Sequence, residues 1–410
     1  MNCCILTIGD ELLQGFTIDT NSSWLSKNLY PHGIRTINIM SVGDDVDSIQ
    51  FILSTIISKQ FDFVFITGGL GPTHDDLTIE AFQNYFNLKS SLDKDYLFEL
   101  KKKFQANQIK MPKINENQAL VLEGCEILNN TLGTARGLYY KYNKTQFFIL
   151  PGVPKELQEI FNREIKGKLL PSKRSVSIRT VKTTGCSESH LYELIENNIK
   201  NNTYKVAFLP HFIGVDIKIE DTNDKNFIDD DFNIFCKEIY KRVKPFSYGW
   251  DLDTIQFIVT NLLKENKRTV ATAESCTGGL LSKMITDIPG SSNVFLGGIV
   301  AYSNNVKTSI LDVKHDTIKT FGAVSKETAR EMAYGVRELF NSNIGIGTTG
   351  ISGPDGGNDT KPIGIVYISI SYKDKYYDKK FSFAYGRDNH RMMTAQAALN
   401  MIRMKDDIIN

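Results

Sequence analysis

Apolar runs alternate with amphipathic segments over the first 171 residues of the chain. Segments rich in apolar residues predict strands at residues 3–8, 34–40 and 61–67. Apolar residues recur at helical spacing in residues 20–30 and 46–58, which predicts helices there. Strand–helix alternation of this kind is typical of a parallel sheet with helices on both faces. We therefore expect a three-layer αβα domain of the α/β class over residues 1–171.

The pattern changes over residues 172–248. The predicted strands are residues 175–183, 206–209 and 214–220, and the predicted helices are residues 187–199 and 227–243. This order predicts a small α+β domain of βαββα type. We expect the polar run 221–225 to be a surface turn and residues 244–249 to be a linker.

Residues 251–410 return to strand–helix alternation and predict a third domain, again of the α/β class. The predicted strands are residues 269–273, 294–302, 344–348, 363–372 and 377–383, and the predicted helices are residues 254–265, 280–285, 326–340 and 387–401. The last two strands are expected to form a hairpin. Ser325 is a suitable N-cap for the helix that follows it.

Composition narrows the class of protein. The chain has 410 residues, of which 41% are hydrophobic and 23% charged, as is usual for a globular protein of several domains. No apolar run is long enough to span a bilayer and no signal peptide is visible, so we expect a cytoplasmic protein without a membrane partner. The net charge of +1 gives no support for nucleic-acid binding. Six scattered cysteines indicate free thiols.

Three polar loops follow three predicted strands of the last domain: residues 274–279, 302–307 and 348–357. If these strands are parallel, the loops meet at one edge of the sheet and bring together Ser275, Tyr302 and Lys307. A serine hydroxyl is a weak nucleophile until a base takes its proton, and a desolvated lysine can be that base. Backbone N–H groups near Ser275 and Thr349 could hold an oxyanion. These are the parts of an acyl-transfer site, such as that of an amidase.

Structural interpretations of the same residues remain open. Ser275 could be only a helix N-cap. Cys276 could replace it as the nucleophile or be an inert buried thiol. Arg387 and Arg391 lie four residues apart on one helix face, where they could bind a phosphate or only face solvent.

A glycine-rich loop at residues 68–78 follows a buried strand of the first domain. Gly68, Gly69 and Gly71 allow close approach of the backbone to a phosphate, and Thr73 adds a donor. Acidic residues repel a phosphate unless a divalent cation bridges the two. The candidate cation ligands, brought to one sheet edge by three strand ends, are Glu11, Asp44, Asp75 and Asp76. Asp19 is more simply a helix cap.

The last domain closely resembles the CinA C-terminal family, the nicotinamide-nucleotide amidohydrolases. The resemblance rests on residues 273–279, 298–304 with Lys307, 322–325 and 349–357. It implies hydrolysis of the carboxamide of nicotinamide mononucleotide (NMN) without a cofactor, with Ser275 as nucleophile and Tyr302 and Lys307 assisting proton transfer. The expected substrate contacts are Cys276, Thr277, Gly278, Gly279, Thr349, Gly350, Gly353, Arg387 and Arg391.

The first domain resembles the molybdopterin-binding fold and the N-terminal half of full-length CinA proteins. Residues 9–15, 19–21, 42–45 and 68–78 carry this resemblance. It implies an ADP-ribose pyrophosphatase that depends on a divalent cation, Mg²⁺ or Co²⁺. Residues 172–248 are similar to the KH-type middle domain of these proteins, but no Gly-x-x-Gly clamp is present, so RNA binding is not inferred.

The resemblance also leaves other functions to test. The first half could be a pterin- or nucleotide-binding module without turnover, or the chain could be a competence or damage-inducible interaction protein. Members of the family are usually dimers, so we expect a homodimer whose partners are small nucleotides.

Overall fold

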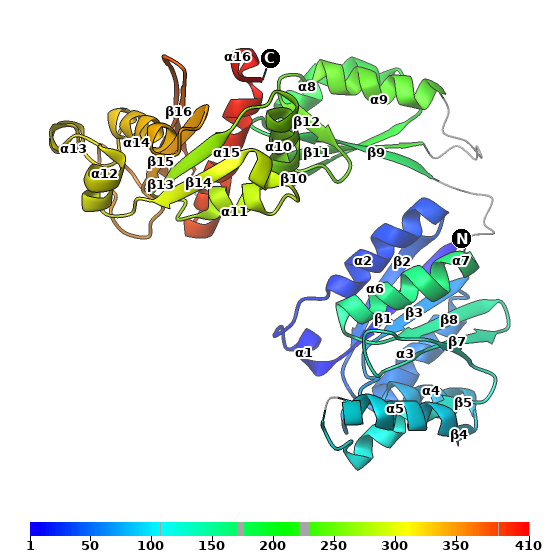
Figure 1. Ribbon diagram of the computed structural model, residues 1–410. Coiled ribbons are helices and arrows are strands. Elements are labelled where there is room, and N and C mark those ends of the chain that lie inside the picture. Colours follow the sequence, from blue (N-terminus) through cyan, green and yellow to red (C-terminus); the bar gives the residue numbers. More distant parts are fainter. Residues whose placement is uncertain (107, 170–175, 222–229, 384, 410) are drawn as a thin grey trace. The chain divides into compact units, whose positions relative to one another are not determined.

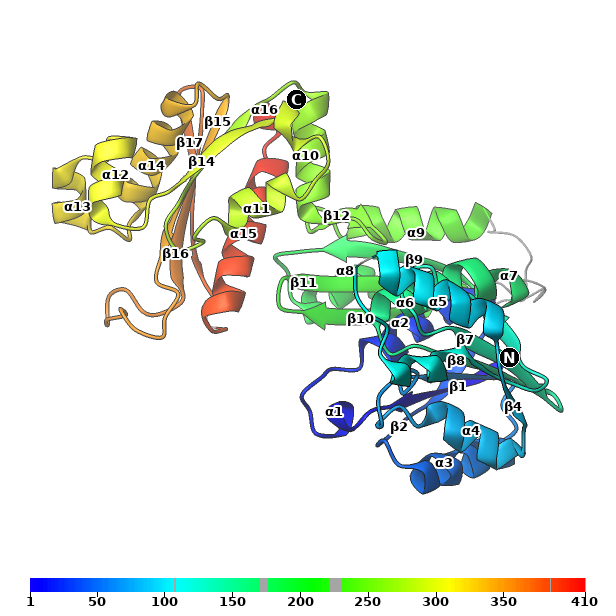
Figure 2. The ribbon, with the colours of Figure 1, turned by 60° about the horizontal axis from the view of Figure 1, so that its bottom comes forward.

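The computed structural model describes the chain except for residues 107, 170–175, 222–229, 384 and 410. The chain divides into two compact units. Of the described residues, the first unit comprises those up to Ser177, and the second comprises those from Ile178 onward. Each unit is built on its own sheets, as Figures 1 and 2 show from two directions.

The first unit is built on a sheet with strand order β2-β1-β3-β8-β7-β6. The strands are β1 (Asn2–Ile8), β2 (Arg35–Val42), β3 (Phe63–Thr67), β6 (Glu126–Leu128), β7 (Gly137–Tyr142) and β8 (Thr145–Leu150). The four strands β2, β1, β3 and β8 are parallel, which confirms the parallel arrangement predicted for the first three. The strands β7 and β6 continue the sheet in antiparallel pairs.

Helices cover both faces of this sheet (Figure 1). The helices of the unit are α1 (Asp10–Leu13), α2 (Thr20–Leu29), α3 (Val46–Ser58), α4 (Thr78–Phe86), α5 (Lys94–Ala106), α6 (Pro154–Ile160) and α7 (Lys166–Leu169). One hydrophobic core lies between the sheet and the pair α3 and α4, and a second lies between the opposite face and α2, α6 and α7. The three-layer prediction is therefore confirmed.

The second unit begins with a sheet of order β10-β11-β9-β12 packed against two helices. Its elements are β9 (Ser177–Thr183), α8 (Glu188–Lys200), β10 (Lys205–His211), β11 (Gly214–Asp221), α9 (Asp230–Arg242) and β12 (Ser247–Trp250). The linker predicted at residues 244–249 is wrong in its second half, because β12 pairs with β9 and buries Ser247 and Tyr248. The surface turn predicted at residues 221–225 lies outside the described residues except for Asp221, which ends β11.

The rest of the second unit is another three-layer arrangement around a sheet of order β14-β13-β15-β16-β17. The strands are β13 (Val270–Glu274), β14 (Phe295–Val300), β15 (Ile344–Gly350), β16 (Ile365–Tyr372) and β17 (Lys375–Ser382). β13, β14 and β15 are parallel, and β16 and β17 form the predicted hairpin. The three polar loops therefore leave the same edge of one sheet, as expected from the sequence.

Helices cover both faces of this sheet as well. They are α10 (Ile255–Glu265), α11 (Leu280–Thr286), α12 (Asn304–Leu311), α13 (His315–Phe321), α14 (Lys326–Leu339), α15 (Arg387–Arg403) and α16 (Asp406–Ile409). The core on one face includes side chains of α10, α11 and α15, and the core on the other includes side chains of α12 and α14. Ser325 caps α14 as predicted, accepting a hydrogen bond from Thr328 N. Within the described residues, no helix combines the length and the apolar character needed to cross a membrane.

Candidate active sites

The turn after β13 places Ser275 at the carboxyl edge of the parallel strands. Ser275 N donates a hydrogen bond to the carbonyl of Thr348 (2.9 Å), which ties the turn to the neighbouring strand β15. The next helix, α11, has Gly279 at its N-cap position, with φ of 91° and no side-chain cap. Ser275 is therefore not the cap of this helix, and its hydroxyl is left for another contact.

The side chain of Lys307 supplies that contact. Lys307 lies in α12, which begins behind the N-cap Ser303. Its side chain is only 1% exposed, and its Nζ lies 3.1 Å from Ser275 Oγ. Nζ also donates to the carbonyl oxygens of Ala301 (2.7 Å) and Tyr302 (3.1 Å). The structure thus brings Ser275 and Lys307 into direct contact.

The surroundings of Lys307 favour its neutral form. Burial lowers the pKa of Lys307 from its usual value of 10.5, while the Cys276 thiol acts weakly in the opposite direction. A neutral amine has two N–H bonds and one lone pair. Since Ala301 and Tyr302 offer two carbonyl acceptors, both N–H bonds can be directed to them, which leaves the lone pair toward Ser275 Oγ. The amine can then accept the serine proton.

Cys276 has the properties of an inert thiol. Its side chain is 6% exposed, and burial raises the pKa of the thiol to about 12. A nucleophilic cysteine needs a pKa depressed toward neutrality, because the thiolate is the reactive form. The geometry therefore favours Ser275 over Cys276 as the nucleophile.

Glu274 is an important residue of this turn that the sequence analysis did not single out. Its carboxylate is fully buried and accepts hydrogen bonds from Gly279 N (2.9 Å), Leu281 N (3.0 Å), Ser282 N (2.8 Å) and Ser282 Oγ (2.5 Å). It satisfies the free N–H groups at the start of α11 and neutralises the positive end of the helix. An acidic residue shortly before a helix was the signal that could have revealed this role.

These hydrogen bonds limit the choice of oxyanion donors. The N–H groups of Gly279 and Ser275 are both bonded within the protein, so neither is free for a substrate oxygen. The N–H groups between them, those of residues 276–278, remain the candidates in this turn.

The threonines proposed as substrate contacts have buried hydroxyl groups with protein partners. Thr277 Oγ1 lies 2.9 Å from Thr348 Oγ1, and Thr349 Oγ1 donates to the carbonyl of Ala323 (2.7 Å). Gly350 is the last residue of β15. These residues therefore contribute to the shape of the edge of the sheet.

Arg387 and Tyr302 meet at the start of α15. Arg387 Nη1 donates to the carbonyl of Gly353 (3.0 Å), and Nη2 lies 3.5 Å from the hydroxyl of Tyr302. The side chain of Tyr302 is 64% exposed. The phenol of Tyr302 thus contacts Arg387, and the contact of this residue with Lys307 is made by its carbonyl. Arg391, one turn further along α15, contacts the carbonyl of Thr277 and lies beside Gly278.

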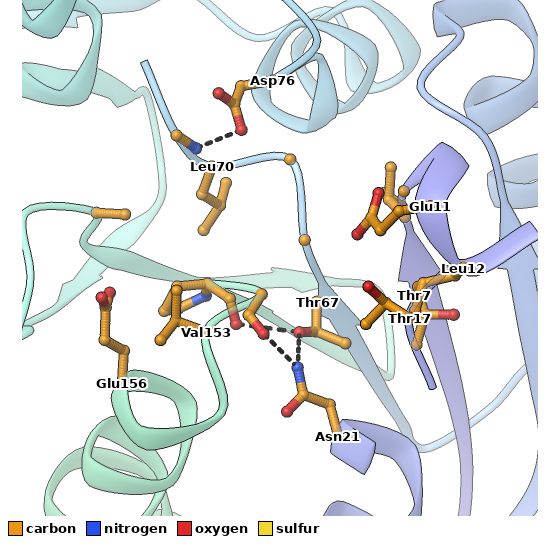
Figure 3. Close-up of a pocket in the computed structure, with 18 of the residues that line it drawn as sticks. Thr7, Glu11, Leu12, Thr17, Asn21, Thr67, Leu70, Asp76, Val153 and Glu156 are labelled. Carbon is orange, nitrogen blue, oxygen red and sulfur yellow. Dashed lines mark hydrogen bonds between the residues drawn. The ribbon is translucent and has the colours of Figure 1, made fainter. Parts of the chain in front are cut away.

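A second candidate site is a cavity of about 510 Å³ at the carboxyl ends of the parallel strands of the first unit (Figure 3). Gly68, Gly69 and Gly71 line it, as the sequence predicted. Gly68 has φ of 107°, and a Cβ atom at this position would lie 2.1 Å from the carbonyl oxygen of Ile8. The turn therefore requires glycine.

The charged side chains among the described residues that line this cavity are all carboxylates. The acidic residues that line it are Glu11, Asp19, Asp44, Asp75, Asp76 and Glu156, and none of the described lining residues is Lys, Arg or His. Glu11 and Glu156 lie on opposite sides of the view in Figure 3. Asp19 also caps α2, since its side chain accepts from Ser22 N.

The predicted cation ligands have different surroundings. Asp76 Oδ1 accepts from Gly71 N (2.6 Å), and Asp76 Oδ2 accepts from both Thr73 N (2.7 Å) and Thr73 Oγ1 (2.6 Å), so this carboxylate holds its own loop together. Asp44 accepts from Asp10 N (2.9 Å). Burial raises the pKa of Asp44, the hydrogen bond from Asp10 N acts in the opposite direction, and the charges of Asp10, Glu11 and Asp75 raise the pKa further. Asp75 is exposed and pairs with His74.

The carboxylate oxygens that line the cavity are ligands of the kind that a hard divalent cation prefers. Among the described residues, however, no group of three or more His, Cys, Asp or Glu side chains is arranged to hold a metal ion. Mg²⁺ is commonly held by one or two carboxylates together with the phosphates of its substrate, so a complete protein cage is not required. Asp44, Glu11 and Asp75 are the candidates for these one or two carboxylates, because all three line the cavity and the charges of Glu11 and Asp75 act on the carboxyl group of Asp44.

Fold and sites together define a multi-domain α/β protein with a molybdopterin-binding-like first domain and a KH-type middle domain. Family models match residues 4–171 ("Probable molybdopterin binding domain"), 178–249 ("Damage-inducible protein CinA KH domain") and 252–405 ("CinA C-terminal domain"). The chain is 37% identical to the CinA-like protein of Cytophaga hutchinsonii over 97% of this chain and 96% of that protein. It is 35% identical to the CinA-like protein of Thermotoga maritima over 97% of each. The chain belongs to the CinA family.

Solved structures of this family match single parts of the chain. The match with the competence/damage inducible protein CihA from Agrobacterium tumefaciens covers 36% of this chain and 92% of the CihA chain. The two are 36% identical in sequence, and the TM-score is 0.36.

Proposed function

We propose that the last domain is a nicotinamide-nucleotide amidase, which releases ammonia from the carboxamide of NMN and leaves nicotinate mononucleotide. The observation that carries this proposal is the 3.1 Å contact between Ser275 Oγ and a buried Lys307 whose pKa is lowered. A serine beside a neutral amine is suited to acyl transfer, and it needs no metal ion or cofactor for this step.

The reaction proceeds in two halves. Lys307 takes the proton of Ser275 as Oγ attacks the carboxamide carbon, and the carbonyl oxygen becomes an oxyanion. When the tetrahedral intermediate collapses, the C–N bond breaks, and Lys307 returns its proton to the leaving nitrogen, which departs as ammonia. In the second half, Lys307 takes a proton from water as the water oxygen attacks the acyl–serine ester. The ester C–O bond then breaks, Lys307 returns the proton to Ser275 Oγ, and the product leaves as its carboxylate. N–H groups of the turn after Ser275 can stabilise the oxyanion, typically by about 3–4 kcal/mol for one donor.

The experiment is ammonia release from NMN by the purified full-length chain. Ser275→Ala should lower turnover by several orders of magnitude, whereas the neighbouring Cys276→Ala should retain most of it. Equal rates for wild type and Ser275→Ala would remove Ser275 as the nucleophile, and loss of turnover in Cys276→Ala alone would move that role to the thiol.

A second activity is favoured by the carboxylate-lined cavity of the first unit. We propose that this cavity cleaves the diphosphate of ADP-ribose in the presence of Mg²⁺ or Co²⁺. A diphosphate is repelled by six acidic lining residues unless a divalent cation offsets their charge. When bound, the cation would be held by one or two of the carboxylates Asp44, Glu11 and Asp75 together with the diphosphate, and it would polarise the phosphoryl oxygens. The glycines of residues 68–71 leave room for the phosphates at the same edge of the sheet.

The test of this second activity is AMP release from ADP-ribose with Mg²⁺ or Co²⁺ and with a chelator. Cation-dependent release that falls in Asp44→Asn but not in Ser275→Ala supports it. Binding of ADP-ribose without AMP release would instead identify a nucleotide-binding module.

A further inference from the structure

The guanidinium of Arg391 binds the turn that carries Ser275, the proposed nucleophile. Its Nε and Nη2 both donate to the carbonyl of Thr277, at 3.2 and 3.0 Å. A Cβ atom on Gly278 would lie 3.3 Å from Arg391 Nη2, so the guanidinium is packed directly against this glycine. Thr277 and Gly278 lie two and three residues after Ser275. The arginine therefore holds the peptide units that follow the nucleophile.

His390 makes an equivalent contact with the loop after β15. Its ring is 1% exposed, and Nδ1 lies 2.9 Å from the hydroxyl of Ser352, which is itself buried. Burial lowers the pKa of His390, while the carbonyl groups of Gly364 and Ile365 act in the opposite direction. The neutral ring can accept a hydrogen bond from the Ser352 hydroxyl at Nδ1. Ser352 precedes Gly353, whose carbonyl binds Arg387. The imidazole thus holds the loop at residues 348–357 through Ser352.

Arg387 differs from both in its exposure. It is an exposed residue at the first position of α15, and its contacts at 3.0 and 3.5 Å use one N–H each of Nη1 and Nη2. A guanidinium has five N–H donors, so others remain for an anion. Arg391 also uses two N–H groups, but it is partly buried and directs both of them to one carbonyl, that of Thr277.

We propose that Arg391 and His390 are positioning residues that hold the two loops beside Ser275 in their reactive geometry, and that Arg387 is the arginine of this pair that meets the phosphate of the substrate. This inference rests on the proposed amidase function and goes beyond it by separating two arginines that the sequence alone treats alike. The first turns of one helix would then set the geometry of acyl transfer without touching the reacting atoms.

Turnover of two substrates distinguishes positioning from phosphate binding. NMN and nicotinamide riboside share the carboxamide, but only NMN carries the phosphate. We expect Arg391→Met and Arg391→Lys to lower kcat on both substrates alike, by roughly 10- to 100-fold, the effect of one hydrogen bond to a charged group. Lysine should not rescue, because its ammonium lacks the fork that binds the Thr277 carbonyl. Arg387→Met should raise KM for NMN alone.

The opposite kinetic pattern would overturn the proposal. If Arg391→Lys turns over NMN like wild type and Arg391→Met only raises KM for NMN, Arg391 is a phosphate ligand. For His390, we expect His390→Leu and Ser352→Ala to lower kcat to the same extent, their combination to add nothing, and His390→Asn to restore most of the rate. If the losses in kcat of His390→Leu and Ser352→Ala add up in the double variant, the two residues do not act as a pair and their positioning role is wrong.

A measurement independent of turnover keeps this inference separate from the proposed function. Hydrogen–deuterium exchange of the peptide covering residues 275–279 should be faster in Arg391→Met and Arg391→Lys than in wild type, and unchanged in Arg387→Met. Unchanged exchange in both Arg391 variants would overturn the positioning role. If wild type releases no ammonia from NMN, the proposed amidase fails, and the exchange result still decides whether Arg391 holds the turn.

Discussion

Replacing Lys307 by methionine tests the step on which the amidase proposal depends. Methionine keeps an unbranched side chain of similar length but has no nitrogen, so Ser275 Oγ loses the group that lies 3.1 Å away. A general base typically contributes about 10²- to 10⁴-fold to a rate, or about 3–5 kcal/mol of activation free energy. We expect kcat for ammonia release from NMN to fall by this factor, with KM close to that of wild type.

The same substitution should change stability much less than activity. The carbonyls of Ala301 and Tyr302 lose their shared donor, at about 1–3 kcal/mol for each buried acceptor left unpaired. The variant also gains stability, because the folded protein no longer carries the free-energy cost of burying the Lys307 amine away from water. These terms oppose each other, so the variant should remain folded, with a Tm within about 10 °C of wild type. Thermal unfolding followed by circular dichroism measures this.

The lowered pKa of Lys307 sets the direction in which activity and stability should change with pH. Because only the neutral amine is a base, kcat/KM of wild type should rise with pH through the pKa of Lys307, which lies below 10.5. Between that pKa and 10.5 the unfolded chain binds the proton that the folded chain has released, so the free energy of unfolding of wild type should also rise with pH in this window. Both rises should be missing in Lys307→Met.

Arginine at the same position is the matched control. Lys307→Arg keeps a cation and N–H donors but does not deprotonate, so a folded Arg variant should be as inactive as the Met variant. Wild-type turnover in Lys307→Arg would show that the group acts as a cation and not as a base. Wild-type turnover in Lys307→Met would refute the reasoning altogether.

Three further predictions concern other parts of the two sites. Glu274→Gln should destabilise the chain by about 2–4 kcal/mol, because an amide offers one acceptor oxygen where the carboxylate accepts four hydrogen bonds; a Tm equal to wild type would contradict this account. Wild type and Cys276→Ala should keep their turnover after treatment with a thiol reagent at neutral pH, since burial raises the pKa of the Cys276 thiol to about 12; rapid inactivation of wild type alone would contradict it. Removal of divalent cations should abolish AMP release from ADP-ribose without lowering ammonia release from NMN, and loss of both activities would show that the two sites are not independent.

Much of the fold could be predicted because apolar periodicity reports burial directly. Residues 63–66 of the strand predicted at 61–67 are all apolar, and β3 (Phe63–Thr67) is buried along its whole length, with helices packed on both of its faces. The helix predicted at residues 46–58 has the bounds of α3. The prediction failed at residues 247–249, the second half of the linker predicted at residues 244–249. The pairing of β12 with β9, about 65 residues away, decides that structure, and local composition contains no signal for it.

The candidate site shows the same division between local and distant signals. Ser275, Gly278 and Gly279 lie in one short motif after a buried strand, so sequence reasoning could find the turn. It could not tell the tasks of Arg387 and Arg391 apart, because their spacing is the same on any helix. The hydroxyl of Tyr302, expected beside the lysine, contacts Arg387 and is exposed.

The sequence by itself determined the strand–helix alternation of the segments it predicted, the loops that end three parallel strands, and the residues those loops could offer to chemistry. These are properties of short segments, set by the periodicity of side chains and by the small residues of the turns. The tertiary structure alone decided that the amine of Lys307 is buried 3.1 Å from the hydroxyl of Ser275. The two residues are 32 positions apart, and only the packing of α12 beside the sheet removes water from the amine, which lowers its pKa and favours the neutral form that the proposed mechanism needs.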